Sequence, residues 1–186
     1  QRDISLYLDD ARAHGLHITH VIETHFHADF LSGHLELAAA TGAEIVFGRA
    51  ADGRTDFPIR TMGDNESIVL GEGADAVHLT ILETPGHTPE LVSVVVRESR
   101  DSEPHAVLTG DTLYIADVGR HDLTTAVGHD ADSLARQLYS SLHDKLLKLP
   151  DTTLVYPAHG AGSACGKNLS TNTVSTIGEQ RRTNYA

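Results

Sequence analysis

The chain is poor in sulfur and in aromatic side chains. Its 186 residues include one Cys, one Met and no Trp, and aromatic residues make up 5% of the sequence. The single cysteine, Cys165, excludes an internal disulfide and a cysteine-rich structural zinc site. No apolar run approaches the roughly 20 residues of a membrane-spanning helix, and no basic segment followed by an apolar one predicts a signal peptide. We therefore expect a cytoplasmic protein that has no membrane partner.

Positive charge is also scarce, whereas histidine is abundant. The 14 Lys and Arg residues stand against 26 Asp and Glu, which gives a formal net charge of -12. Nucleic-acid binders neutralise phosphates with clustered Lys and Arg, so no nucleic-acid partner is expected. The 13 histidines are informative because imidazole is the commonest protein ligand for transition metals. With 40% hydrophobic residues the chain is long enough to bury one ordinary core, and we predict a single domain over residues 1–186.

Hydrophobic periodicity predicts strands that alternate with helices. We expect helices over about residues 3–14, 35–40 and 132–149, the last from leucines at spacings of three and four. Apolar and β-branched runs predict strands over residues 18–22, 43–48, 91–99, 105–115 and 153–160. Between residues 52 and 84, short segments punctuated by glycine predict mainly antiparallel strands, and the tail from residue 163 is polar. The expected fold class is α/β.

Ligand-type residues follow four of the predicted strands, each where the strand ends and a loop begins. They are His25, His27 and Asp29, then His87, then Asp111, and finally His159. Alternation along an extended segment places the first three on one side, so they can converge without a helix. A lone His-x-His motif is equally compatible with a polar surface loop. The ordered conjunction of four such sites is what favours a metal centre.

In that order, the segments THFHAD, TPGHT, TGDTL and YPAHG resemble the metallo-β-lactamase superfamily over nearly the whole chain. The resemblance implies a metallo-β-lactamase-like αββα sandwich. That fold usually opens with two or three strands, whereas this chain opens directly on its first predicted helix. We therefore expect an N-terminally incomplete domain that lacks those strands and leaves one sheet edge uncovered.

Phe30 departs from the dinuclear pattern of this superfamily. Its dinuclear hydrolases, glyoxalase II among them, have a second-metal His at this position, and an apolar ring cannot ligate. The simplest remaining site is mononuclear, with His25, His87 and Asp111 as metal ligands. Two His and one carboxylate on one face of the metal are the arrangement of non-haem Fe(II) oxygenases. Such a site leaves positions open for a sulfur donor and for O2.

The segments ETHFHADF, LETPGHTPE, GDTLYIADVGR and YPAHGAGSACGKNLSTNTVSTIGEQRRTN look like the persulfide dioxygenase (sulfur dioxygenase) branch, especially its bacterial members related to rhodanese-fused forms. This resemblance implies one Fe(II) per chain as the cofactor. It implies that glutathione persulfide, or a similar low-molecular-weight persulfide, reacts with O2 to give sulfite and free thiol. No rhodanese-like sequence follows in this chain, so a rhodanese-type sulfurtransferase would be a separate partner. A homodimer is the expected assembly if the chain associates.

The same resemblance assigns further residues to the surroundings of the metal. His27, Asp29 and His159 would orient ligands or bound water without necessarily ligating. Arg120 would bind a substrate carboxylate through its planar guanidinium, and the alternative for this residue is a surface or inter-strand ion pair.

Cys165 is the second residue predicted to contact the substrate. A nearby Lys167 would lower the pKa of its thiol and favour the reactive thiolate. The alternative is an ordinary loop cysteine.

Three other interpretations of the sequence remain open. One is a zinc or mixed-metal thioester hydrolase resembling glyoxalase II, in which a metal-bound hydroxide attacks a glutathione thioester. Phe30 is the feature against that hydrolase. Another is a metal-binding module that senses persulfide through Cys165 without turnover. The last is a chain without activity because the N-terminal strands are lacking.

Overall fold

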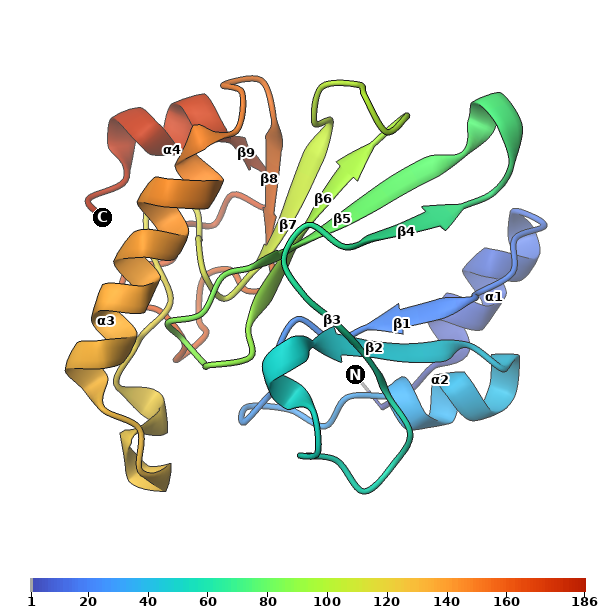
Figure 1. The fold of residues 1–186 in the computed structure, drawn as a ribbon, viewed down its shortest axis with the longest axis horizontal. Helices are drawn as coiled ribbons and strands as arrows, with labels where there is room; N and C mark the ends of the chain where they lie inside the picture. Colours follow the sequence, from blue (N-terminus) through green and yellow to red (C-terminus); the bar gives the residue numbers. More distant parts are fainter. Residues whose placement is uncertain (1) are drawn as a thin grey trace.

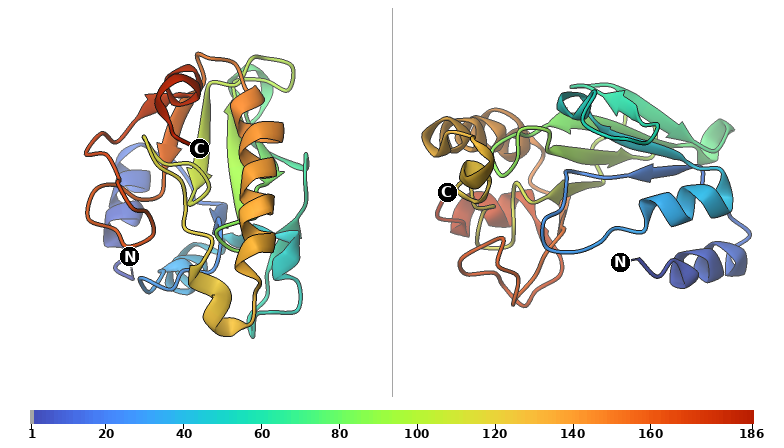
Figure 2. Two further views of the ribbon diagram at one scale, coloured as in Figure 1. Left: turned by 90° about the vertical axis from the view of Figure 1, so that its left-hand side faces the viewer. Right: turned by 90° about the horizontal axis from the view of Figure 1, so that it is seen from below.

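Two β-sheets lie face to face between two layers of helices. The computed structural model describes residues 2–186. Helices α1 (Ser5–Ala13) and α2 (His34–Thr41) lie on the outer side of the smaller sheet, and α3 (Ala131–Ser140) and α4 (Ile177–Thr183) lie beyond the larger sheet (Figure 1, Figure 2). The order of layers is therefore αββα, which confirms the predicted fold class.

The two sheets differ in strand direction. The smaller sheet contains the parallel strands β1 (His20–Ile22), β2 (Glu44–Gly48) and β3 (Arg60–Met62), in that order. The larger sheet contains, in order, β4 (Ser67–Leu70), β5 (Val77–Glu83), β6 (Val92–Arg97), β7 (Ala106–Gly110), β8 (Leu154–Pro157) and β9 (Ser175–Thr176). Its strands are antiparallel except for the β7–β8 pair. The predicted antiparallel pairing between residues 52 and 84 is thus confirmed for β4 and β5 and wrong for β3, which runs parallel to β2.

Strand alternation divides the core into layers. In β2, Val46 faces the larger sheet and packs with Val92 and Val94 of β6. Its neighbours Ile45 and Phe47 point to the opposite face, toward α2. Because successive side chains of a strand point to opposite faces, a short β-branched strand can serve both layers. Each such side chain contributes about 1.5–3 kcal/mol when fully buried.

The third helix follows the predicted leucine spacing, but it changes geometry partway. Asp130 caps α3 by accepting a hydrogen bond from the backbone N–H of Ser133 at 2.9 Å. The regular α-helix ends at Ser140 and continues as a π-helical turn over Ser141–Lys145 and a 3₁₀ turn over Leu146–Lys148. Leucines of all three pieces pack in one cluster with Val95 and Val107 of the larger sheet: Leu138, Leu142 and Leu146. Leu134, one turn earlier, is also buried. The helix predicted over residues 132–149 is therefore confirmed in place and corrected in form.

The polar tail contains structure that its composition did not predict. Strand β9 pairs with β8, and α4 begins at Ile177, whose side chain is completely buried. Thr176 caps this helix by accepting from the backbone N–H of Glu179. Further 3₁₀ turns occur at Arg49–Ala51, Gly73–Asp75 and Leu123–Val127. No helix in residues 2–186 combines the length and the apolar character needed to cross a membrane.

Candidate metal centre

The strand ends converge as the sequence predicts. His25 follows β1, His87 lies in the loop between β5 and β6, and Asp111 follows β7 directly. His25 Nε2 lies 3.5 Å from Asp111 Oδ2, and His87 Nε2 lies 3.3 Å from the same oxygen. One ligand-type atom from each residue lies within 4.8 Å of the others, and all three side chains are buried. The three residues form a metal-binding site of two imidazoles and one carboxylate.

Hydrogen bonds aim both imidazoles at this point. The Nδ1–H of His87 donates to the carbonyl oxygen of Arg120 at 2.8 Å, which leaves Nε2 with its lone pair free. His25 Nδ1 is 2.9 Å from the hydroxyl oxygen of Thr24, so its Nε2 also faces the centre. Asp111 Oδ2 is buried without a hydrogen-bond partner. A buried anionic oxygen that lacks a donor but lies beside two imidazole nitrogens fits a bound cation.

The protonation states also suit a metal. Burial lowers the pKa of His25 to about 4, although the nearby Asp111 carboxylate opposes the shift, so this ring is neutral at physiological pH. Burial alone would raise the pKa of Asp111, but the His159 hydrogen bond and the neighbouring imidazoles lower it to about 2. Neutral imidazole and ionised carboxylate are the forms that ligate metals.

His159 links the triad to Asp29. Its Nδ1 is 2.8 Å from Asp111 Oδ1, and its Nε2 is 2.8 Å from Asp29 Oδ2. The hydrogen bond with Asp111 raises the pKa of His159, which keeps the ring available as a donor to both carboxylates. The two oxygens of Asp111 therefore have different partners. Oδ1 pairs with His159, and Oδ2 faces the imidazoles of His25 and His87. Asp29, His159 and Cys165 also form a second group with ligand-type atoms within 4.8 Å of one another.

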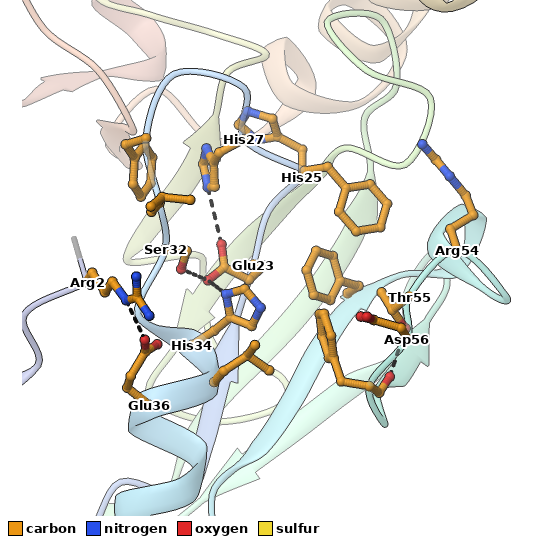
Figure 3. Close-up of a pocket in the computed structure, with 16 residues that line it drawn as sticks. Arg2, Glu23, His25, His27, Ser32, His34, Glu36, Arg54, Thr55 and Asp56 are labelled. Atoms are coloured by element: carbon orange, nitrogen blue, oxygen red, sulfur yellow. Dashed lines mark hydrogen bonds and ion pairs between the residues drawn. The ribbon is translucent and has the colours of Figure 1, made fainter.

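His27 directs its Nε2 toward a carboxylate that the sequence reasoning missed, while its ring lies 4.3 Å from that of His25. Figure 3 shows His27 and His34 directed at Glu23, whose oxygens lie 3.2 Å from His27 Nε2 and 3.4 Å from His34 Nδ1. Ser32 also donates to Glu23. Burial raises the pKa of Glu23, but the contacts with His27 and Ser32 outweigh it, and the pKa falls below its usual value. The only available signal was an acid at the end of the strand, four positions before His27.

The surroundings of His27 are largely apolar. The ring of Phe30 lies 4.3 Å from that of His27, so an aromatic face borders this imidazole. His27 and Phe30 line a cavity of about 480 Å³, and Phe26, Phe47 and Phe57 line it as well. The guanidinium of Arg54 lies 4.7 Å from the centre of the Phe26 ring.

Arg120 contributes to the site first through its backbone. Its carbonyl holds His87, whereas its guanidinium makes a two-pronged ion pair with Asp122, at 2.9 Å from Nε and 2.6 Å from Nη2. The surface ion pair considered from the sequence is therefore present. The guanidinium borders a separate cavity of about 330 Å³, which Lys167 and Tyr185 also line.

Cys165 lies beside Asp29 and His159, but its surroundings do not favour the reactive thiolate. Its side chain is buried, and burial raises the pKa of its thiol. The lowered pKa expected from Lys167 is therefore wrong, because desolvation dominates. The Cys165 carbonyl accepts a hydrogen bond from the backbone N–H of Arg120 at 3.0 Å, which joins the two residues predicted to contact the substrate.

Comparison with known families agrees with this centre. The family model described as the metallo-beta-lactamase superfamily matches residues 1–159, a range that contains the whole triad. The chain belongs to the metallo-β-lactamase superfamily.

Superfamily relatives of two activities match the chain to similar degrees. A hydroxyacylglutathione hydrolase of Polaromonas sp. is 36% identical over 153 residues, which cover 82% of this chain and 52% of the relative. The mitochondrial persulfide dioxygenase ETHE1 of Bos taurus is 32% identical over 186 residues, which cover 99% of this chain and 61% of the relative. The chain thus spans little more than half the length of these superfamily members.

Solved structures that resemble this chain likewise include a metallo-beta-lactamase and an ETHE1 protein. A metallo-beta-lactamase from Staphylococcus aureus has a TM-score of 0.86 at 34% identity, covering 99% of this chain and 53% of that one. ETHE1 from Myxococcus xanthus has a TM-score of 0.75 at 30% identity, covering 98% of this chain and 68% of that one. The ETHE1 relatives support the persulfide dioxygenase branch that the motifs predicted.

Proposed function

We propose that this chain oxidises glutathione persulfide, or a similar low-molecular-weight persulfide, with O2 to sulfite and free thiol. The supporting observation is the buried group of His25, His87 and Asp111, which does not include His27 because the Nε2 of that ring pairs with Glu23. Two imidazoles and one carboxylate suit one Fe(II) and leave coordination positions for substrate. Iron bound there would supply the redox chemistry that activates O2.

The overall reaction balances without a further reductant. One persulfide, one O2 and one water give one thiol, one sulfite and two protons. The bond between the two sulfur atoms breaks, the outer sulfur gains three oxygens, and its electrons reduce O2. The protein must therefore hold the persulfide in place and bring water to the oxidised sulfur, while keeping the ligands fixed.

The residues around the triad divide these tasks. His159, which also pairs with Asp29, holds Oδ1 of Asp111, and Oδ2 would then be free to bind the metal. Cys165 lies close to Asp29 and His159 and would contact the bound persulfide. None of these roles requires an ionised thiol on the protein.

Arg120 would recognise a carboxylate of the carrier thiol. In the free protein its guanidinium pairs with Asp122 on an exposed part of the loop. A substrate carboxylate can replace Asp122 because both present the same two-oxygen edge to the guanidinium fork. The adjoining cavity of about 330 Å³ has room for part of a peptide-like carrier.

A second candidate is metal-dependent hydrolysis of a glutathione thioester. The observations that favour it are the similarity to the Polaromonas hydroxyacylglutathione hydrolase and the second group of ligand-type atoms at Asp29, His159 and Cys165. Phe30 counts against it because a phenyl ring replaces the imidazole of a second metal site.

Oxygen dependence separates the two candidates. We would supply anaerobically purified, iron-loaded protein with glutathione persulfide in an oxygen electrode and measure sulfite at the end. A second sample without O2 would receive a glutathione thioester, with thiol release as the signal. We expect O2 uptake matched by sulfite, lost in His87→Ala, and no thioester hydrolysis. Anaerobic hydrolysis without any O2 uptake on persulfide would overturn the proposal.

A further inference from the structure

Asp117 is a buried acid in the loop that follows the metal ligand Asp111. Its side chain is completely buried, and its carboxylate accepts four hydrogen bonds. Oδ1 accepts from the backbone N–H of Val118 at 2.8 Å and from the hydroxyl of Tyr185 at 2.7 Å. Oδ2 accepts from the backbone N–H groups of Lys167 and Asn168 at 2.7 and 2.5 Å. All of its hydrogen-bond partners are therefore backbone amides or a phenol.

The absence of a cation makes this burial costly. Among the ion pairs of residues 2–186, none involves Asp117. Burial raises the pKa of Asp117, and only the several donors together bring it below its usual value. A charge buried without a cation is tolerated where its donors are fixed in advance. Two of its donors belong to the loop of Cys165, which lies beside His159 of the metal centre, and this points to a role in positioning that loop.

The donors to Asp117 come from three parts of the chain. Val118 is its own neighbour in the loop after Asp111. Lys167 and Asn168 belong to the loop of Cys165, and Tyr185 belongs to the segment after α4. The Cys165 loop approaches so closely that a Cβ added to Gly166 would lie 3.0 Å from Asp117 Oδ2. The Cys165 loop is also joined to Arg120, whose backbone N–H donates to the carbonyl oxygen of Cys165 at 3.0 Å.

Helix α4 and the residue after it hold the loop that contains Asp117. Gln180 accepts from the backbone N–H of Ala116 at 2.8 Å, and Ala116 has a φ of 65°, a conformation that residues other than glycine rarely adopt. Asn184 donates to the carbonyl oxygen of Asp117 at 3.0 Å. The segments GDTLYIADVGR and GEQRRTN are thus in direct contact, through Ala116 and Asp117 of the first and Gln180 and Asn184 of the second.

We propose that Asp117 is a positioning residue, which holds the Cys165 loop and the backbone of Arg120 against the metal centre and so shapes the side where the substrate enters. The link to substrate rests on the proposed function, whereas the link to the loop does not. Asp117 belongs neither to the triad nor to the lining of the two cavities described above, so it acts through the residues that it holds. It would thereby set affinity for the persulfide more than the chemistry of the metal.

Alkylation of the single cysteine tests the loop directly. Asp117→Asn keeps the shape but replaces one acceptor oxygen by an NH₂ group, which faces donors. We would measure the rate at which iodoacetamide modifies Cys165 in the iron-loaded protein. The expected rate in Asp117→Asn is about tenfold above that of the unchanged protein, because the loop opens more often. The matched control is Glu179→Gln, which removes an exposed carboxylate of α4 that pairs with Arg182 and should leave the rate unchanged.

Turnover then distinguishes positioning from general stability. In Asp117→Asn we expect the KM for glutathione persulfide to rise by about tenfold, with less than a threefold fall in kcat and with iron content unchanged. Tyr185→Phe removes one donor and should produce a smaller increase in alkylation, and it provides the test if Asp117→Asn does not fold. Alkylation at the unchanged rate in the folded variants would overturn the role of Asp117. Failure of every protein to consume O2, with the alkylation difference intact, would instead overturn the proposed function.

Discussion

Gly119 offers the sharpest single-atom test of how the backbone supports the metal centre. A Cβ at this position would lie 1.8 Å from the carbonyl oxygen of Asp111 and 3.1 Å from the Cβ of His87. Carbon and oxygen approach no closer than about 3.3 Å in ordinary contacts, so Gly119→Ala must separate the two segments by about 1.5 Å. No side-chain rotation can relieve a contact between backbone atoms. The displacement therefore reaches two of the three metal ligands.

The magnitude follows from that geometry. Overpacking of this kind costs about 1–3 kcal/mol of unfolding free energy, which lowers the melting temperature by about 2–12 °C for a domain of this size. Displacement of ligands should also weaken metal retention by about 10–100-fold, as disturbance of supporting contacts does elsewhere.

Thermal unfolding of the metal-free chain and iron retention against a chelator measure the two effects separately. Gly160→Ala is the matched control, because the nearest atom to its added Cβ is Ser170 O at 3.8 Å, an ordinary contact. Equal melting temperatures and equal iron retention in the two variants would refute the argument that Gly119 is needed for close backbone approach.

Three further predictions concern stability. Leu146→Ala should lower the free energy of unfolding, measured with denaturant, by about 2–5 kcal/mol because this side chain is fully buried. Leu6→Ala should change the same free energy by less than about 0.5 kcal/mol, since Leu6 is 73% exposed. Equal changes in the two variants would contradict the assigned core. Asp130→Ala should cost about 0.5–2 kcal/mol by removing the cap of α3, and Asp130→Asn should restore most of it. Burial raises the pKa of Glu90, but hydrogen bonds from a backbone amide and from Arg54 lower it below 4.5, so its contribution is present above that pH and is lost as the pH falls through the folded value. Unfolding free energies between about pH 3 and pH 7 should therefore show a weaker acid dependence in Glu90→Gln, and an unchanged profile would count against the pair.

The parts of the fold that depend on local pattern were predictable from the sequence. The leucines of α3 lie at helical spacing, and the β-branched runs of β2 and β6 read as strands because both faces are buried. The triad of His25, His87 and Asp111 was predictable for another reason, since each member lies in the loop just after a strand and in a motif that resembles those of the superfamily.

Features decided by tertiary contacts were not predictable. Strand β3 pairs parallel to β2 because the connection between them crosses over, and no residue of β3 signals its direction. Helix α4 has few apolar residues, and its stability comes from burying Ile177 and Gln180 against other elements. The roles of Glu23 and Asp117 were invisible for the same reason, because an acid in a sequence does not disclose which donors will surround it.

Metal content and O2 uptake, measured on one sample, test whether a single iron site in this chain oxidises persulfide. Protein purified without O2 would be analysed for metal by elemental analysis, and the same sample would then receive glutathione persulfide in an oxygen electrode. We predict about one iron per chain and uptake of about one O2 per persulfide, as a two-His, one-carboxylate dioxygenase site requires. Two zinc ions per chain and no uptake of O2 would contradict the account and favour the hydrolase.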